Sequence, residues 1–290
     1  MASTDRCETT AEGPFATPLG DFGHAWVSFN ESEPNWPDIQ LLMVSSGLPQ
    51  EGILAAVAIG LDQRKYHQYF AGLAGRQTMT MMPYLARPKS RGAIYLRSKR
   101  PLDRQVIDPK YLSHPDDIAA FLKGIGLAMN ISRTSPFVKN LGTRFHARPL
   151  DDCKDRALGS REYWVCYIQH MASTFYHFAG SCKMGPATDP KSVVDEELKV
   201  RGVYGVRVID ASVMPTVVSA NLMASTIMIA EKAADKIKEK LANQARSADY
   251  VLYNWLDSQS VDDLFEENLA ELQVEVSQFV QEYPTENYSR

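Results

Sequence analysis

The residues best suited to chemistry lie between Tyr176 and Lys236, where a histidine, an aspartate and an asparagine follow one another. The first is His177, in the segment YHFAGSCKMGP. An imidazole titrates near neutrality, so it can accept a proton from a substrate hydroxyl group within hydrogen-bond reach. A single histidine is more often structural than catalytic, and that alternative stands for the residue alone. Its place shortly before Gly180, at the expected end of a helix, favours a side chain that projects into a cleft.

Asn221 is the second candidate, and it directly precedes the apolar segment LMASTIMIAEKAADKI. Asparagine is favoured at the start of a helix, where it caps free backbone N–H groups, so one interpretation is structural. The other is chemical, because an amide cannot act as a base at neutral pH but can donate a hydrogen bond to a developing alkoxide. The two roles are compatible. Free N–H groups near Leu222 and Met223 would also favour an electron-rich ligand.

Asp210 and Ala211 lie at the end of VYGVRVID, a segment with the composition of a short buried strand. An acid at the end of a strand is commonly structural. The end of a strand in an open sheet is also where cofactors lie, so the pair is a candidate cofactor contact.

Two helices are expected to position these groups. Residues 161–180 should form one, with Tyr176 and His177 at its C-terminal end, and residues 222–243 should form another with a strong apolar face. From Arg246 onward the chain has ten acidic and two basic residues, with Leu and Val at roughly helical spacing. This tail is predicted to be one or two acidic amphipathic helices, or else a solvated acidic extension.

The earlier part of the chain has a different pattern. Residues 22–60 alternate short apolar segments with Pro and Gly, which is typical of strands and turns, and RGAIYLRSK alternates like a strand. HPDDIAAFLKGIGLAMNIS has helical spacing and contains Gly124 and Gly126. A dinucleotide-binding motif needs its glycines between a strand and a helix, so two glycines inside a helix indicate a packing role.

Composition excludes several classes of protein. The formal charge of −4 gives no support for nucleic-acid binding, and no apolar stretch approaches the roughly 20 residues needed to span a membrane. The first residues lack the pattern of a signal peptide. The four cysteines have no CxxC spacing or companion His pairs, so no metal site is expected. Cys153 and Cys166 could pair in an oxidising compartment or remain two thiols.

The three consecutive segments YHFAGSCKMGP, VRGVYGVRVIDASVMP and SANLMASTIMIAEKAADKI resemble the C-terminal signature of the glucose–methanol–choline (GMC) oxidoreductases. GPFATP, NWPDIQ and RGAIYLRSKRPLDRQVIDPKYL are similar to the substrate-binding half of the same family. REYWVCYIQHMASTFYHFAGSCKMGP is most similar to arthropod members related to glucose dehydrogenase. The loop SANLMAST differs from the family pattern in being more apolar.

The resemblance implies an FAD enzyme that oxidises an alcohol. His177 would accept the substrate hydroxyl proton while hydride passes to flavin N5, and Asn221 would hydrogen-bond the substrate oxygen. The residues implied to contact FAD are Asp210, Ala211, Leu222 and Met223.

The resemblance also implies an α+β fold. Residues 1–170 would form an antiparallel-sheet substrate domain with flanking helices, residues 171–245 the C-terminal part of an FAD-binding α/β domain, and residues 246–290 an acidic helical tail. The family's N-terminal GxGxxG unit, which holds the ADP part of FAD, has no counterpart in this sequence. The chain is therefore expected to be the C-terminal portion of a longer enzyme.

The expected activity is FAD-dependent oxidation of a CH–OH group of an alcohol or sugar, with a quinone or oxygen as electron acceptor. The alternative is a truncated, non-catalytic protein that acts through interactions. The residues do not indicate a location, although the resemblance implies secretion.

Overall fold

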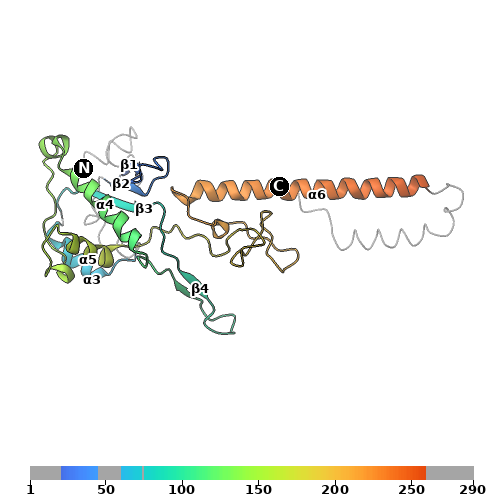
Figure 1. Cartoon of the computed structure of the whole chain (residues 1–290), viewed down its shortest axis with the longest axis horizontal. Coiled ribbons are helices and arrows are strands. Elements are labelled where there is room, and N and C mark those ends of the chain that lie inside the picture. The colour runs from blue at the N-terminus through green and yellow to red at the C-terminus, as the bar shows by residue number, and fades with distance from the viewer. Residues whose placement is uncertain (1–20, 45–59, 74, 259–290) are drawn as a thin grey trace. The chain divides into compact units, whose positions relative to one another are not determined.

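The computed structural model describes residues 21–44, 60–73 and 75–258 (Figure 1). These residues combine helices with two small antiparallel sheets, so the expected mixture of α and β structure is confirmed. The chain divides into two compact units, Met1–Ala230 and Glu231–Arg290, which are described separately. Every site residue predicted above belongs to the first unit.

The larger sheet has three antiparallel strands, with β2 (Ile39–Val44) between β1 (Asp21–Val27) and β3 (Thr80–Leu85). Consecutive residues of β2 are buried, so both faces of this central strand are covered. Gln40 is the one polar residue in its sequence, IQLLMV. The strands and turns predicted for residues 22–60 are confirmed as far as residue 44, and residues 45–59 lie outside the described part of the chain.

Helix α4 (Pro115–Ser132) packs against β2 and β3, as predicted for HPDDIAAFLKGIGLAMNIS. Pro115 occupies its first turn, and the side chain of His114 accepts a hydrogen bond from the backbone N–H of Asp116. The buried carboxylate of Asp117 accepts hydrogen bonds from the backbone N–H groups of Lys89 (2.7 Å) and Ser90 (2.9 Å). These bonds attach the loop after β3 to the start of the helix.

The two glycines of α4 differ in their surroundings. A Cβ atom on Gly124 would lie 2.9 Å from Cβ of Pro83 and 3.4 Å from Cγ2 of Ile39, whereas nothing lies within 4 Å of a Cβ on Gly126. The packing role predicted for the glycines is therefore confirmed for Gly124 alone.

Alanine substitutions at these two positions should have opposite effects. Gly124→Ala should lower the free energy of unfolding by about 1–3 kcal/mol, because Pro83 is rigid and cannot move aside. Gly126→Ala is the matched control in the same helix, and it should raise that free energy by about 0.5–1 kcal/mol through helix propensity. Chemical denaturation measures both. Equal effects of the two substitutions would contradict the packing role of Gly124.

A separate hairpin follows the larger sheet, formed by β4 (Ala93–Tyr95) and β5 (Val106–Asp108). It confirms the strand predicted for RGAIYLRSK over three of its residues. Ile94 and Tyr95, on opposite faces of β4, are both more than half exposed.

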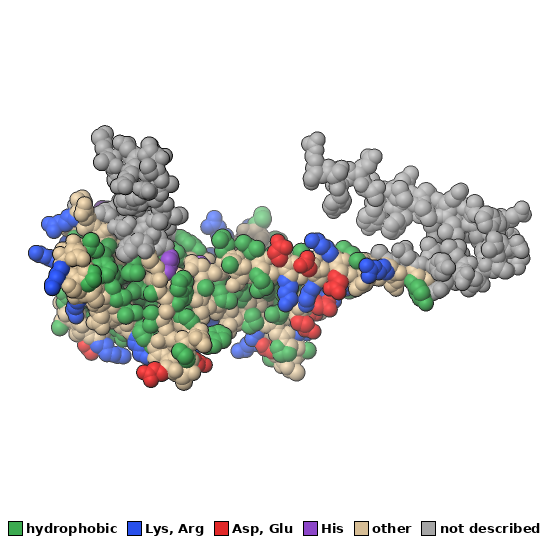
Figure 2. Space-filling view, turned by 90° about the horizontal axis from the view of Figure 1, so that it is seen from above, with side chains coloured by type: hydrophobic (Ala, Val, Ile, Leu, Met, Phe, Trp, Pro, Cys, Tyr) green, Lys and Arg blue, Asp and Glu red, His purple; other side chains and the backbone are tan. Residues whose placement is uncertain are grey.

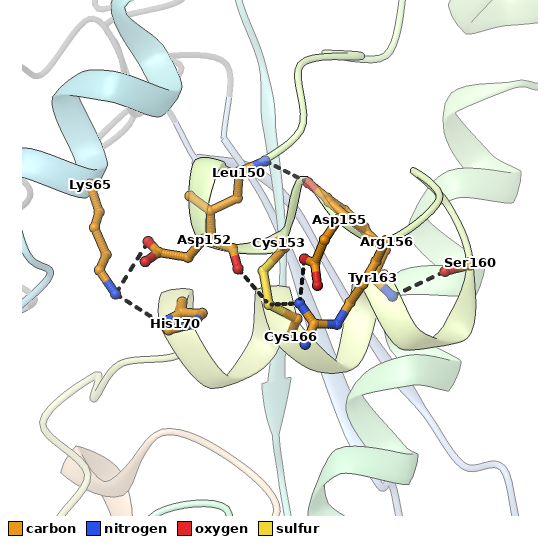
Figure 3. Close-up of a disulfide and its surroundings, with 10 residues drawn as sticks. All are labelled: Lys65, Leu150, Asp152, Cys153, Asp155, Arg156, Ser160, Tyr163, Cys166 and His170. Carbon is orange, nitrogen blue, oxygen red and sulfur yellow. Dashed lines mark hydrogen bonds and ion pairs between the residues drawn. A yellow bond between two sulfur atoms is a disulfide. The ribbon is translucent and has the colours of Figure 1, made fainter.

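A second core forms where α3 (Gln63–Phe70) meets α5 (Arg161–Met171) and two short turns, Ala71–Leu73 and Asp151–Cys153. Its buried members are Tyr69, Leu150, Cys153, Tyr163 and Cys166. A further single turn, Pro136–Asn140, follows α4. The Tyr163 hydroxyl accepts a hydrogen bond from the backbone N–H of Leu150, which joins α5 to the preceding loop (Figure 3).

Cys153 and Cys166 form a disulfide within this core (Figure 3). Of the two states left open by the sequence, the structure has the paired one. Arg156 approaches the Cys166 sulfur at 3.4 Å, and His170 lies one turn further along α5. Lys65 joins this region to α3 through His170 Nδ1 at 2.8 Å and the carboxylate of Asp152 at 3.4 Å.

Loss of this disulfide should lower the free energy of unfolding by about 3 kcal/mol, because the bond closes a loop with a sequence separation of 13. Chemical denaturation with and without a reductant measures the effect, and Cys153→Ala/Cys166→Ala should reproduce it. Cys182 is a free thiol, so Cys182→Ala should leave the dependence on reductant unchanged. Identical denaturation midpoints with and without reductant would count against the stabilising role of the bond.

The structure corrects the strand expected over VYGVRVID. This segment contributes only an isolated bridge between Lys199 and Arg207, and Tyr204 is fully exposed. Gly202 and Gly205 adopt positive φ angles of 75° and 77°, which place a turn before the segment and another within it. The composition predicted a strand because it is rich in valine, but the chain turns too often here to extend.

The last described element is α6 (Leu222–Ser258), which confirms the helix predicted over residues 222–243 and extends it. Residues 246–258 of the predicted acidic tail continue this helix, and residues 259–290 lie outside the described part of the chain. Acidic and basic side chains follow one another along it in the second unit (Figure 2). Of the helices in the described residues, none combines the length and hydropathy needed to cross a bilayer.

Candidate active site

His177 lies in an irregular segment outside any helix, so its predicted place at the end of a helix is wrong. Helix α5 ends at Met171, nine residues earlier than predicted, and Ala172 is already extended. The backbone N–H of Tyr176 donates to the Thr174 hydroxyl at 3.1 Å, which is a local turn that competes with helix continuation. Tyr176 itself has a positive φ of 63°, a conformation that non-glycine residues rarely adopt and that is frequent at functional sites.

The segment after His177 is attached to the residues around Asp210. Backbone N–H groups of residues 180, 182 and 184 donate to the carbonyls of residues 211, 212 and 213, at 3.4, 2.9 and 2.8 Å. Gly180 has a φ of 84°, and a Cβ atom there would lie 3.2 Å from the carbonyl oxygen of Met214, so this position requires glycine. GSCKMG is therefore held against DASV along its length.

Asp210 begins a single 3₁₀ turn, Ala211–Val213, and does not end a strand. Its carboxylate accepts a hydrogen bond from the backbone N–H of Ser212 at 2.7 Å. The carbonyl of Ala211 accepts from Gly180, while no acceptor among the described residues pairs with the backbone N–H groups of Asp210 and Ala211. The structural interpretation of Asp210 holds for its side chain, and two backbone donors remain free for a ligand.

His177 and Asn221, far apart in the sequence, meet at their side chains. Asn221 Nδ2 lies 3.1 Å from Nε2 of His177. On its other side, Asn221 Oδ1 accepts a hydrogen bond from Nε2 of Gln40 at 3.3 Å. Gln40 Nε2 also lies 3.0 Å from Nδ1 of His24, so four side chains form one connected line from β1 to His177.

Burial lowers the pKa of His177 below its ordinary value. The ring is partly buried and makes an edge contact with Phe175, at 6.2 Å between centroids. Phe175 in turn packs against Tyr84 of β3. A lowered pKa keeps the imidazole neutral at pH 7, which is the form that can accept a proton.

Asn221 directly precedes α6, as predicted, but its side chain is directed across to His177 and Gln40. The following two residues differ in exposure: Leu222 is 6% exposed and Met223 is 75% exposed. The N–H groups of the first helical turn have no intrahelical acceptors, so they remain available to a ligand. Close by, the hydroxyl oxygen of Ser219 is buried without a hydrogen-bond partner.

Two residues of this arrangement, Gln40 and His24, were missed by the interpretation of the sequence. Gln40 had a usable signal, because it is a single polar residue inside an apolar strand. His24 had none, since it lies on an edge strand of ordinary composition.

Among the described residues, one group has ligand atoms near enough to one another to suggest a metal site. These atoms belong to Cys153, Cys166 and His170 and lie within 4.8 Å of one another. The two sulfur atoms are joined in the disulfide, so they do not offer thiolates to a metal. A cavity of about 480 Å³ lies beside the end of GSCKMG. It is lined by Lys183, Met184, Gly185, Pro186, Asp189, Glu196 and Pro215. Neither His177 nor Asn221 lines it.

Comparison with known proteins identifies relatives for most of the described chain. Residues 88–230 match the family model described as GMC oxidoreductase. Glucose dehydrogenase [FAD, quinone] of Drosophila pseudoobscura pseudoobscura is 39% identical over 206 residues, which are 71% of this chain and 31% of that protein. Alcohol dehydrogenase [acceptor] of Pseudomonas putida is 43% identical over 154 residues, 53% of this chain and 26% of that protein. The chain thus spans a third or less of the length of these curated relatives.

Solved structures resemble this one in fold. Formate oxidase aligns with a TM-score of 0.60 at 19% identity, over 83% of this chain and 42% of the other. Pyridoxine 4-oxidase from Mesorbium loti aligns with a TM-score of 0.57 at 20% identity, over 74% of this chain and 37% of the other. Through residues 88–230, which hold His177 and Asn221, the chain belongs to the GMC oxidoreductase family as a carrier of its C-terminal domain.

Proposed function

We propose that this chain supplies the proton-handling half of an FAD-dependent oxidoreductase that oxidises a CH–OH group of an alcohol or sugar. The observation that carries the proposal is the contact between Nδ2 of Asn221 and Nε2 of His177, at 3.1 Å. A base and an amide donor side by side match the needs of one substrate hydroxyl group, which must lose a proton while its oxygen gains charge.

His177 is the proton acceptor in this proposal. Its lowered pKa keeps the imidazole neutral at pH 7, so one ring nitrogen carries a lone pair. In this structure the lone pair on Nε2 accepts from Asn221, and a substrate hydroxyl that enters between the two side chains would donate to it instead. Asn221 has two N–H groups on Nδ2 and directs one at His177, so the other can donate to the substrate oxygen as charge develops there. Its amide carbonyl is engaged by Gln40, which holds the donor side toward the substrate.

The residues near Asn221 fit an FAD group. Its flavin would be met by the free N–H groups of Leu222 and Met223 and by the unpartnered hydroxyl of Ser219. The backbone N–H groups of Asp210 and Ala211 would face the ribityl–pyrophosphate part. When bound, FAD supplies the acceptor for the hydride that leaves the substrate carbon.

The domain organisation proposed for this function follows the sequence. Residues 1–170 would shape the substrate side, residues 171–245 would complete the flavin-binding domain, and residues 246–290 would form an acidic tail. The substrate would be a small alcohol or sugar. A quinone is favoured over oxygen as electron acceptor because two of the relatives are named glucose dehydrogenase [FAD, quinone]. We also propose that the protein is secreted, as the resemblance of its sequence to this family implies.

A non-catalytic interaction protein is the second candidate. It is favoured by the apolar face of α6, where Ile227 and Met228 are 54% and 55% exposed. Tyr176 and Phe178 are also more than half exposed on either side of His177. Apolar side chains in this number around one site are typical of a surface that another polypeptide covers.

Flavin binding separates the two candidates. The purified chain is mixed with FAD and passed over a desalting column, and retained flavin is measured by its visible absorption. In parallel, residues 88–230 replace the matching segment of Drosophila melanogaster glucose dehydrogenase [FAD, quinone], and oxidation of glucose and simple alcohols is followed with a quinone dye. Activity of the chimera supports the proposed function, whereas an inactive chimera that still holds FAD overturns it. A colourless chain together with an active chimera assigns the second candidate to the chain on its own.

A further inference from the structure

Gln40 is an amide buried in the middle of an apolar strand. It is 8% exposed, and its neighbours Ile39 and Leu41 are completely buried. β2 is paired on both edges, so the backbone around Gln40 is already satisfied by β1 and β3. A buried polar side chain is costly unless it is hydrogen-bonded, and Gln40 adds nothing to the sheet that an apolar residue would not add. Its position therefore calls for a role outside the sheet.

Both N–H groups of the Gln40 amide are engaged. One is directed to Nδ1 of His24, at 3.0 Å, and the other donates to Oδ1 of Asn221, at 3.3 Å. His24 lies on the adjacent strand β1 and stacks on Trp26, with 5.6 Å between ring centroids. Since an amide nitrogen can only donate, His24 Nδ1 must accept, and the direction of the Gln40 amide is set.

The direction of one amide determines the direction of the next. With Oδ1 of Asn221 bound to Gln40, the Nδ2 group of Asn221 must point the other way, toward His177. Nδ2 can only donate, so Nε2 of His177 must accept, and the proton of the neutral imidazole must lie on Nδ1. Donation runs in one direction along the line, from Gln40 through Asn221 to His177.

We propose that Gln40 is a positioning residue that selects the tautomer of His177, so that the basic lone pair lies on Nε2, beside the donor group of Asn221. This inference deepens the proposed function and rests on it for the role of His177. With the Gln40 amide reversed, its oxygen would face Asn221, and the Asn221 amide would reverse in turn. Nε2 of His177 would then face an oxygen and carry the proton, which leaves no base at that atom.

Nitrogen-15 NMR of the histidine rings tests the proposal on this chain without flavin, at a pH where His177 is neutral. The two tautomers differ in which ring nitrogen gives a signal typical of an N–H group and which gives one typical of a bare lone pair. The wild-type chain is expected to show the lone pair at Nε2 of His177, whose signals are assigned by their loss in His177→Gln. A proton on Nε2 in the wild type overturns the proposal whatever the variants do.

Gln40→Glu is the sharpest variant, because a carboxylate of the same size can only accept. It should draw Nδ2 of Asn221 toward itself and move the His177 proton from Nδ1 to Nε2. Gln40→Met removes the hydrogen bonds with little change in volume and should give a mixture of tautomers. Gln68→Glu is the control, since it makes the same charge change at an exposed position of α3 and should leave His177 unchanged.

Circular dichroism establishes that each variant is folded. An unchanged His177 tautomer in a folded Gln40→Glu or Gln40→Met variant overturns the proposal. The NMR result does not depend on flavin or substrate, so failure of the positioning role and failure of the proposed oxidation are separate outcomes.

Discussion

Replacing His177 with alanine should lower kcat/KM for alcohol oxidation by about 10²–10⁴-fold in the flavin-containing protein, because the substrate hydroxyl loses its proton acceptor. The flavin content should not change, since none of the backbone donors proposed to hold FAD belongs to His177. Steady-state rates with a quinone dye measure the first quantity, and the visible flavin absorption per protein measures the second.

The pH dependence of the wild type gives a second measure of the same residue. Burial lowers the pKa of His177, so the neutral base persists to lower pH than an ordinary histidine would allow. The acid limb of log kcat/KM should therefore lie below the ordinary histidine value of about 6.5, and activity should fall as the pH drops through that limb. This limb should be absent from the residual activity of His177→Ala.

His67→Ala provides the matched control, because His67 is an exposed histidine in α3. It should retain wild-type rates and the wild-type pH profile. Turnover within a few-fold of wild type in His177→Ala would remove His177 from the mechanism, and loss of flavin in that variant would assign it to cofactor binding.

His177 also shows how much of the site could be predicted from the sequence. The resemblance to the family implied that His177 and Asn221 act on the same substrate oxygen, and the structure brings the two side chains together. The helix expected to position His177 was wrong, because the helical periodicity continued past the point where Thr174 offers the backbone a competing hydrogen bond. The resemblance indicated which side chains would meet, but the residues did not reveal the local backbone conformation that brings them together.

Helices and strands that pack in the core were predicted better than segments on the surface. Helix α4 and the strand β2 repeat apolar residues because each faces a core. The helix was predicted with nearly correct bounds, and the strand lies within the strands and turns predicted for residues 22–60. VYGVRVID is also rich in apolar residues, but Val203, Tyr204 and Val206 are largely exposed, and the turns at Gly202 and Gly205 determine its shape. Composition alone does not distinguish the two cases.

Gln40 could not be placed from sequence for a different reason. Its hydrogen bond to Asn221 joins residues 181 positions apart, and no local pattern contains information about such a pairing. A polar residue inside IQLLMV indicated that some partner exists, but only the packing of the sheet beside the start of α6 identifies it. The geometry of the site therefore depends on the N-terminal sheet as much as on the C-terminal segments that hold His177 and Asn221.

Replacing Asn221 with alanine should lower kcat by about 10²–10³-fold, the effect of losing one donor to a developing oxyanion. KM should change much less, because the bond strengthens as charge develops on the oxygen and contributes little to the bound alcohol. Stopped-flow reduction of the flavin by substrate measures this step directly. Asn221→Asp should be at least as impaired, since a carboxylate cannot donate and would place a negative charge beside the alkoxide.

A double-mutant cycle between Asn221→Ala and Gln40→Met tests whether these residues act as one unit. Gln40 acts on the reaction only through Asn221, so the second substitution should add little once Asn221 is absent, and the two effects should be strongly non-additive. Thr226→Ala is the control, because this hydroxyl bonds only within the first turn of α6, to the Leu222 carbonyl at 2.9 Å. Additive losses from Asn221 and Gln40 would mean that Gln40 supports the rate by a route other than the amide of Asn221, and a kcat unchanged in Asn221→Ala would leave His177 as the sole polar participant from this chain.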